Sequence, residues 1–200
     1  MKTIGLIGGM SWESTATYYR LINQGIRQRC GGLHSAKMLL YSVDFAEIEE
    51  LQSNGRWHEA GLLLAEAAAK LEGGGAELLM ICTNTMHKVA DQVAAGVNIP
   101  LIHIAEATGA QILSDQIEAV GLLGTRFTME EDFYRSLLEK RYGLRVEIPA
   151  SDDRKLVDGV IFEELCRGVI SERSREQYLR IAGSLASKGC GAIILGCTEI

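Results

Sequence analysis

The chain has 200 residues, of which 47% are hydrophobic and 23% charged, a composition typical of a globular protein with room for one large or two small domains. Its net charge of -6 and its scattered basic residues argue against a nucleic-acid partner, which needs clustered Lys and Arg. The longest apolar runs are far shorter than the roughly 20 residues of a membrane-spanning helix, so we expect a soluble protein without a membrane segment.

The cysteines indicate a reducing compartment. There are five of them, an odd number with no Cys-x-x-Cys pair, which fits neither a disulfide framework nor a structural zinc site. We therefore expect a cytoplasmic protein without a structural metal. The five positions are Cys30, Cys82, Cys166, Cys190 and Cys197.

The elements alternate between strands and helices from the start of the chain. A strand over residues 3–7 is followed by a glycine turn over 8–11 and a helix over 14–27. The pattern continues with a strand over 37–43, helices over about 44–53 and 57–71, a strand over 77–81, a helix over 86–95 and a strand that opens at Pro100. This alternation predicts an α/β fold, a parallel sheet with helices on both faces.

The second half of the chain repeats the first. The run Gly5-Leu6-Ile7-Gly8 matches Gly121-Leu122-Leu123-Gly124 at an offset of 116 residues, and the same offset lays the helix from His58 over the helix from Ser174. It pairs Gly73, Gly75 and Ala76 with Gly189, Gly191 and Ala192, whereas Cys82 and Cys197 miss it by one residue, which a single deletion in the last strand would reconcile.

We therefore predict two pseudo-symmetric α/β domains, residues 1–97 with Cys82 and residues 98–200 with Cys197. Each cysteine follows an apolar strand, in GAELLMICTNT and GAIILGCTEI. Ligands of open α/β sheets bind at the carboxyl ends of the strands, so we expect both thiols to face one cleft between the domains.

Two opposed thiols can invert a stereocentre, because one removes the proton from carbon while the other delivers a proton to the opposite face. An unperturbed thiol has a pKa of about 8.5, near enough to neutral pH for one thiolate and one thiol to coexist. Without a cofactor, the developing negative charge needs fixed donors around it. Thr83, Asn84 and Thr85 could supply them beside Cys82, and Thr198 beside Cys197. Backbone N–H groups of the turns near Met10-Ser11 and Thr125 could add to them.

Other readings of these residues remain open. Glu199 could relay a proton from Cys197 or raise its pKa. His87 could pair with Cys82 as a nucleophile, but its place along the following helix favours another direction. We interpret the remaining cysteines, Cys30, Cys166 and Cys190, as small buried hydrophobic residues. We interpret the remaining histidines, His34, His58 and His103, as structural or exposed. The GLIGGM turn lacks the full spacing of a dinucleotide-binding motif.

Four segments resemble the aspartate/glutamate racemase family of cofactor-independent amino-acid racemases. They are GLIGGMSWEST, LLMICTNTMHKVAD, GLLGTRFTMEEDFY and AIILGCTEI, and they span the chain. The resemblance implies two pseudo-symmetric α/β domains, no cofactor, a homodimer, an amino acid as substrate and Cys82 and Cys197 as the two proton carriers. It also implies substrate contacts by ten residues: Met10, Ser11, Gln52, Thr83, Asn84, Thr85, Thr125, Thr128, Thr198 and Glu199.

The chain departs from this pattern in two places. Aspartate-selective relatives tend to carry basic residues that meet the side-chain carboxylate, whereas DFAEIEELQ is acidic and EELCRG places Cys166 next to Arg167. This predicts a substrate range that is broad or not centred on aspartate. Similar proteins also continue beyond the Cys197 motif through a segment that packs on the first domain, and we expect that segment to be missing here. The alternatives are a related isomerase, hydantoin racemase or decarboxylase, and a noncatalytic sensor of small acids.

Overall fold

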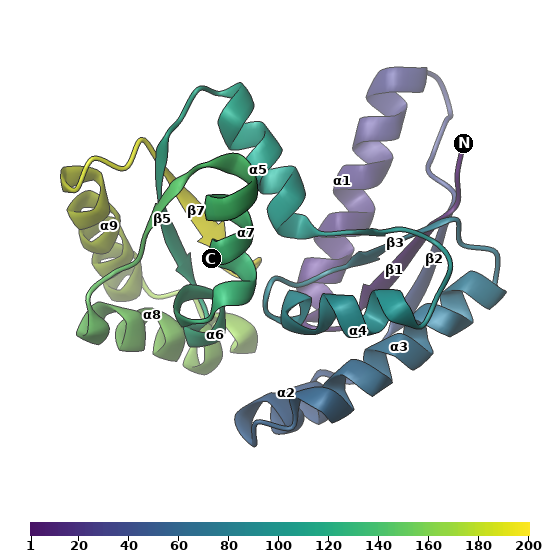
Figure 1. The fold of residues 1–200 in the computed structure, drawn as a ribbon, viewed down its shortest axis with the longest axis horizontal. Helices are drawn as coiled ribbons and strands as arrows, with labels where there is room; N and C mark the ends of the chain where they lie inside the picture. Colours follow the sequence, from purple (N-terminus) through teal and green to yellow (C-terminus); the bar gives the residue numbers. More distant parts are fainter. The chain divides into compact units, whose positions relative to one another are not determined.

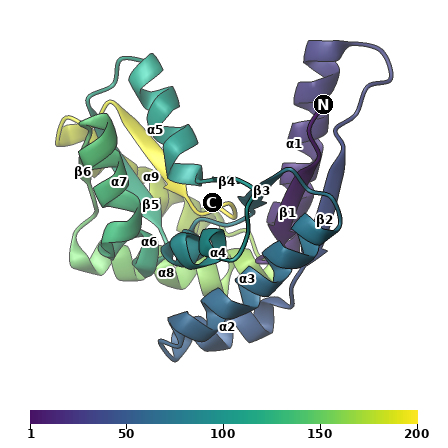
Figure 2. The ribbon, with the colours of Figure 1, turned by 45° about the vertical axis from the view of Figure 1, so that its right-hand side comes forward.

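The computed structural model describes residues 1–200, which pack as two compact units, Met1–His103 and Ile104–Ile200. Both are α/β units, and the colours of Figures 1 and 2 show each unit to be one continuous half of the chain. None of the helices combines the length and the apolar character needed to cross a membrane.

The first unit is built on a four-stranded parallel sheet with the order β2-β1-β3-β4. Helices follow the strands in the alternation that the sequence predicts (Figure 1). The strands are β1 (Ile4–Gly8), β2 (Met38–Ser42), β3 (Leu78–Ile81) and β4 (Leu101–Ile102). The helices are α1 (Trp12–Cys30), α2 (Phe45–Ser53), α3 (Trp57–Gly73), the 3-10 helix η1 (Thr85–Val89) and α4 (Ala90–Ala95).

Strand β1 lies at the centre of this sheet and is covered on both faces. A Cβ on Gly5 would come within 3.3 Å of Leu71 in α3, whereas one on Gly8 would lie 2.4 Å from Thr15 in α1. Residues 5 and 8 point to opposite faces because side chains alternate along a strand. Helices α1 and α3 therefore approach β1 from opposite faces. At Gly8 the contact with α1 leaves no room for a Cβ, and at Gly5 the closest atom to a Cβ would be Leu79 Cδ2 of β3, at 2.8 Å.

The second unit has a three-stranded parallel sheet with the order β6-β5-β7. Its central strand β5 (Ala119–Gly124) is fully buried. The other strands are β6 (Arg145–Glu147) and β7 (Ala192–Gly196). The helices are α5 (Ile104–Ser114), α6 (Arg126–Glu130), α7 (Asp132–Tyr142), α8 (Ser151–Glu163), the 3-10 helix η2 (Leu165–Arg167) and α9 (Glu172–Ser187).

Two hydrophobic clusters cover the faces of this second sheet. Leu122 belongs to one cluster, with Tyr134 and Leu138 of α7. Leu123, on the other face, packs with Val157 of α8 and Leu185 of α9. An all-apolar strand such as β5 is what burial on both faces requires, and the predicted sandwich of helices around a parallel sheet is confirmed.

The repeat is visible in the sheet order, but its register differs from the one predicted. Glycines 5 and 121 keep the offset of 116 residues in the two central strands. After the long helices, however, Gly75 N–H bonds to Glu72 O as Gly189 N–H bonds to Ala186 O. The left-handed Gly75 therefore corresponds to Gly189. The predicted pairing of Gly75 with Gly191 is wrong by two residues.

Two local boundaries also differ from the sequence analysis. Strand β4 pairs with β3 and so keeps residues 101–103 in the first unit, beyond the split expected near residues 97–100. The helix expected over 86–95 begins as the 3-10 helix η1, because His87 N–H bonds to Asn84 O, three residues back.

Candidate active site

Cys82 directly follows β3 and is completely buried. Its N–H donates to Ile7 O at 2.9 Å, which continues the pairing of β1 and β3 by one residue. Its carbonyl oxygen accepts a hydrogen bond from Ser14 Oγ at 3.1 Å. The backbone of Cys82 is therefore held by both the neighbouring strand and the first turn of α1.

The same first turn of α1 holds the loop after β1, which contains the predicted site residues Met10 and Ser11. Ser11 is the N-cap of α1, and its Oγ accepts from Ser14 N–H at 3.3 Å. Thr15 Oγ1 accepts from Gly9 N–H and donates to Ser11 O, both at 2.9 Å. Sequence reasoning missed Ser14 and Thr15, although two hydroxyl residues in the first helical turn after a glycine loop are a readable signal.

The predicted residues Thr83, Asn84 and Thr85 form the turn between β3 and η1. Asn84 and Thr85 are buried, whereas Thr83 is partly exposed. The Thr83 carbonyl accepts from His87 Nδ1 at 2.8 Å, so this nitrogen carries the proton. The ring of His87 packs edge-on against His103 with centroids 4.4 Å apart.

His87 is therefore a fixed neutral support of the turn rather than a charged group. Burial, together with the neighbouring His103, lowers the pKa of His87 to about 3. His103 belongs to the last residues of the first unit. This arrangement argues against a Cys82–His87 nucleophilic pair, because a ring nitrogen of His87 donates to the Thr83 carbonyl.

Gln52, the predicted site residue on α2, is buried beside this turn. Its Nε2 donates to Met86 Sδ at 2.9 Å, and Met86 is itself fully buried in η1. Met10, Ile48 of α2 and Met86 share one hydrophobic cluster. The carboxyl end of the first sheet therefore gathers Met10, Ser11, Gln52 and residues 82–85 at one edge of the unit.

In the second unit, Thr125 and Thr128 lie at the corresponding edge. Thr125 is the N-cap of α6, and its Oγ1 accepts from Thr128 N–H at 3.4 Å. Thr128 is fully buried and packs against the end of β7, where a Cβ on Gly196 would lie 3.2 Å from its Cγ2. This places both threonines beside the strand end that leads into Cys197.

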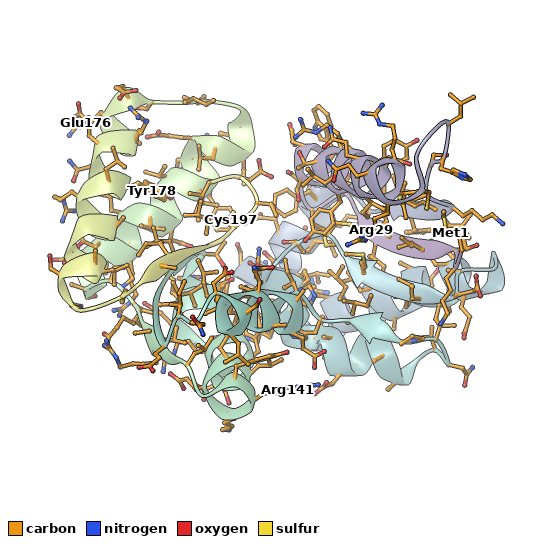
Figure 3. The ribbon with its side chains drawn as sticks, turned by 90° about the horizontal axis from the view of Figure 1, so that it is seen from above. Met1, Arg29, Arg141, Glu176, Tyr178 and Cys197 are labelled. Carbon is orange, nitrogen blue, oxygen red and sulfur yellow. The ribbon has the colours of Figure 1, made fainter.

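Cys197 follows β7 and is partly exposed at the margin of the cluster around α8 and α9 (Figure 3). The backbone N–H groups of Glu199 and Ile200 face its sulfur and favour the thiolate, while the Glu199 carboxylate and the Cys166 thiol disfavour it. Thr198 is exposed and Glu199 partly exposed.

Burial raises the pKa of both thiols to about 12, which favours the protonated form at neutral pH. The two thiols differ in the contacts that lower their pKa against the effect of burial. Only Cys197 has backbone N–H donors directed at its sulfur, whereas burial alone determines the pKa of Cys82. Because the Cys166 thiol and the Glu199 carboxylate act against these donors, the pKa is raised to about 12 in both thiols.

The two cysteines occupy different positions in their sheets. In the second sheet Gly124 pairs with Gly196, and Cys197 is the next residue. In the first sheet Ile7 pairs with Ile81, so Gly8, the counterpart of Gly124, stands opposite Cys82. Cys82 therefore corresponds to Gly196, and the residue that corresponds to Cys197 is Thr83.

No three His, Cys, Asp or Glu side chains gather into a group that could hold a metal ion. The ionisable and polar side chains at the ends of β3 and β7 are instead thiols, hydroxyls, an amide and the Glu199 carboxylate. Together the fold and these strand ends define a class: an α/β protein with two related units, each ending the strand next to its glycine-rich central strand in a Cys-Thr pair.

Comparisons with known proteins agree with this class. The Asp/Glu/Hydantoin racemase family model matches residues 7–200. A crystal structure of a Yersinia pestis protein described as a candidate Asp/Glu racemase is 55% identical, covers all of this chain and 86% of its own, and superposes with a TM-score of 0.92. An aspartate racemase homologue from Pyrococcus horikoshii is 36% identical with a TM-score of 0.82 and the same coverage.

A curated relative is the broad specificity amino-acid racemase RacX of Bacillus subtilis, 24% identical over 141 residues. The matched stretch is 68% of this chain and spans 60% of the length of RacX. The chain belongs to the Asp/Glu/Hydantoin racemase family.

Proposed function

We propose that the protein is an amino-acid racemase that interconverts L- and D-amino acids by moving the proton on the α-carbon. The observation that carries this proposal is the pair of strand ends, CTNT after β3 and CTEI after β7, in a chain of the Asp/Glu/Hydantoin racemase family. Binding alone would not need an ionisable thiol in each unit, which argues against a sensor.

In the proposed reaction, Cys82 and Cys197 act on opposite faces of the substrate's α-carbon. One thiolate takes the α-proton, the carbanion is stabilised by donors at the substrate carboxylate, and the other thiol donates a proton from the opposite side. Thr83, Asn84 and Thr85 are proposed for the carboxylate in the first unit, and Thr125, Thr128 and Thr198 in the second. Met10, Ser11, Gln52 and Glu199 complete the proposed substrate contacts.

Substrate binding must lower the pKa of at least one thiol, because burial alone would keep both protonated. The ammonium group of an amino acid supplies a positive charge of the right sign, since an opposite charge nearby favours a thiolate. The N–H donors at Cys197 act in the same direction. We therefore propose Cys197 as the thiol that first becomes thiolate.

A second assignment of the first-unit proton carrier rests on the register of the two sheets. Thr83 corresponds in position to Cys197 and is partly exposed, whereas Cys82 is completely buried. The Thr83 hydroxyl would then face the α-carbon, with Cys82 packed behind it. A hydroxyl is a much weaker acid than a thiol, so this assignment requires stronger stabilisation of its deprotonated form.

We further propose a substrate range that is not restricted to aspartate. Helix α2 carries Glu47, Glu49 and Glu50 near Gln52, and Arg167 is paired with Glu163 at 2.9 Å, so neither segment offers an unpaired cation for a side-chain carboxylate. RacX is named a broad specificity racemase. The same proposal includes a homodimer and independence from cofactors. It also includes a cytoplasmic location, which the five free cysteines favour.

The experiment is a panel of single-enantiomer amino acids, including aspartate and glutamate, incubated in D2O and analysed by chiral chromatography with mass detection. The proposal predicts that the opposite enantiomer appears and carries deuterium at the α-carbon, while the recovered substrate at first keeps its protium. Loss of carbon dioxide or a cis-trans product would identify a decarboxylase or isomerase instead. Ligand-induced stabilisation without any turnover would identify a sensor.

A further inference from the structure

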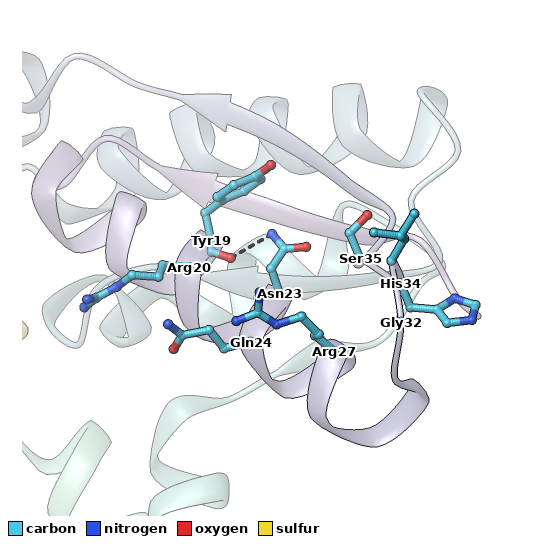
Figure 4. Close-up of a pocket in the computed structure, with 9 residues that line it drawn as sticks. Tyr19, Arg20, Asn23, Gln24, Arg27, Gly32, His34 and Ser35 are labelled. Atoms are coloured by element: carbon cyan, nitrogen blue, oxygen red, sulfur yellow. Dashed lines mark hydrogen bonds between the residues drawn. The ribbon is translucent and has the colours of Figure 1, made fainter.

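A groove of about 490 Å³ lies in the first unit between the second half of α1 and the loop over residues 31–37. This volume falls within the usual range for small-molecule sites, roughly 300–1,000 Å³. Figure 4 shows the helix side, with Tyr19, Arg20 and Arg27, and the loop side, with His34 and Ser35. Asn23, Gln24, Gly32 and Leu33 complete the lining.

The charge of this region is opposite to that of the chain as a whole. Asp and Glu outnumber Lys and Arg 26 to 20 overall, yet no acidic residue occurs between Glu13 and Asp44. The same stretch contains Arg20, Arg27, Arg29 and Lys37. Positive charge is therefore concentrated on α1 and the loop that follows it.

The two arginines of the groove have no carboxylate partner. Neither Arg20 nor Arg27 takes part in an ion pair, whereas Arg56, Arg141, Arg145, Arg154, Arg167, Arg175 and Arg180 each pair with a carboxylate. Arginines near the end of a helix stabilise its dipole, which accounts for Arg27 and Arg29. That effect is confined to the last turn and does not account for Arg20.

The groove is held in shape by the protein itself. Asn23 Nδ2 donates to Tyr19 O at 2.9 Å, and Asn23 Oδ1 accepts from Ala36 N–H at 2.9 Å, so one side chain ties the helix to the loop. Gly31 and Gly32, with φ of 74° and 56°, make the left-handed turn that returns the chain along α1. Both walls of the groove are thus in place before a ligand arrives.

We propose that this groove binds the phosphate chain of a small molecule, with Arg20 and Arg27 as its principal contacts. The two arginines are seven residues apart, which separates their Cα atoms by about 10 Å along the helix axis. A single carboxylate could contact one guanidinium, whereas a chain of phosphates is longer and carries several negative charges for the two arginines. His34, Gln24 and Ser35 offer further donors, and Tyr19 offers an aromatic ring beside them.

This site is separate from the strand ends that carry the cysteines. The N-cap of α1, Ser11, lies at the carboxyl end of β1, and Arg27 is sixteen residues further along the helix, about 24 Å away at the usual rise. Binding in the groove and racemisation can therefore fail independently, so the test below does not depend on the proposed function.

The experiment is calorimetric titration of the whole chain with tripolyphosphate and with ATP, at low and at physiological salt. The variant R20Q/R27Q removes both positive charges and leaves a shorter, neutral amide side chain at each position. Its control is Arg173→Gln, since Arg173 is another exposed arginine without an ion pair, on α9 of the second unit. We expect binding to weaken about tenfold or more in R20Q/R27Q and to stay within about twofold of the wild type in the control.

The two probes distinguish the source of the phosphate chain. Equal affinity for both indicates recognition of phosphates alone, and tighter binding of ATP indicates that the base also contacts the groove. Absence of binding for both probes at millimolar concentration, or an equal loss in R20Q/R27Q and Arg173→Gln, would overturn the proposal. Racemase activity in R20Q/R27Q should equal that of the wild type.

Discussion

Thr83 in the first sheet and Cys197 in the second occupy the same position relative to their central strands. Thr83 is two residues beyond Ile81, the partner of Ile7, and Cys197 is two residues beyond Leu195, the partner of Leu123. The matching Cys-Thr letters in the sequence hide this relation, because Cys82 itself corresponds to Gly196. The thiol that sequence comparison aligns with Cys197 is thus one residue closer to the sheet.

A pair of variants separates the two roles at the end of β3. We expect Thr83→Val to lower kcat/KM by about a hundredfold or more, because its hydroxyl contacts substrate in either assignment. Cys82→Ala then decides between them: an equal loss makes Cys82 the proton carrier, and retention within about tenfold transfers that role to Thr83. Full activity in both variants would show that neither residue moves a proton.

Thiol alkylation tests the raised pKa of Cys197. Since burial raises that pKa to about 12, the rate of reaction with iodoacetamide should still be rising about tenfold per pH unit at pH 9. The rate is followed by peptide mass spectrometry in a Cys30→Ser background, which removes the exposed thiol. A plateau below pH 8 would mean that the N–H donors of Glu199 and Ile200 outweigh burial.

The neutral state of His87 makes stability depend on pH. Its pKa is lowered from 6.5 to about 3 on folding, so the unfolded chain binds more protons in this range and stability falls as pH drops from about 6.5 towards 3. His87→Gln keeps a hydrogen-bonding side chain without a titratable ring. The free energy of unfolding of the wild type should therefore fall more steeply than that of His87→Gln between pH 6.5 and 4; parallel curves would contradict the assignment.

Two N-cap serines separate stability from substrate binding. Ser11 caps α1 at the candidate site by accepting a hydrogen bond from Ser14 N–H. Ser171 caps α9 in the same way, by accepting from Ser174 N–H. Replacing either with Ala should lower the free energy of unfolding by about 1 kcal/mol, measured by urea denaturation. Only Ser11→Ala should also raise KM. An equal change in KM for both variants would remove Ser11 from the site.

Replacing a glycine with alanine should have opposite effects on stability in α1 and in the loop before it. Gly9 has φ of 95°, and a Cβ there would lie 2.2 Å from Val43 O, so Gly9→Ala should cost more than about 2 kcal/mol. Gly25 lies inside α1 with nothing within 4 Å, so Gly25→Ala should stabilise the protein by roughly 0.5–1 kcal/mol. Denaturation midpoints that move in the same direction would contradict this account.

The sequence predicts the elements of the fold well because burial leaves a periodic record. Strand β5 is apolar at every position that two faces of helices cover, and the caps of α1 and α2, Ser11 and Asp44, are the residue types that cap helices. The two-residue shift after α3 and α9 could not be predicted in this way. It depends on which residue of a glycine-rich turn adopts the left-handed conformation, and GGGA and KGCGA each offer several choices.

For the site, the sequence identified the strand ends but not what supports them. Cys-Thr after an apolar strand is a local pattern, so Cys82, Thr83 and Cys197 could be selected from letters alone. The bond from Ser14 to the Cys82 carbonyl joins residues 68 positions apart, and the contact of His87 with His103 depends on how β4 pairs. Such contacts exist only once the sheet has formed.

The central claim is that Cys197 carries a proton to and from the α-carbon. The most direct measurement is the rate of racemisation of Cys197→Ala, by chiral chromatography on the best substrate of the panel, beside Cys190→Ala, a buried cysteine of the same unit. Circular dichroism confirms that both variants are folded. We predict a loss of about a hundredfold to ten-thousandfold in Cys197→Ala and near wild-type activity in Cys190→Ala. Full activity in Cys197→Ala would contradict the account.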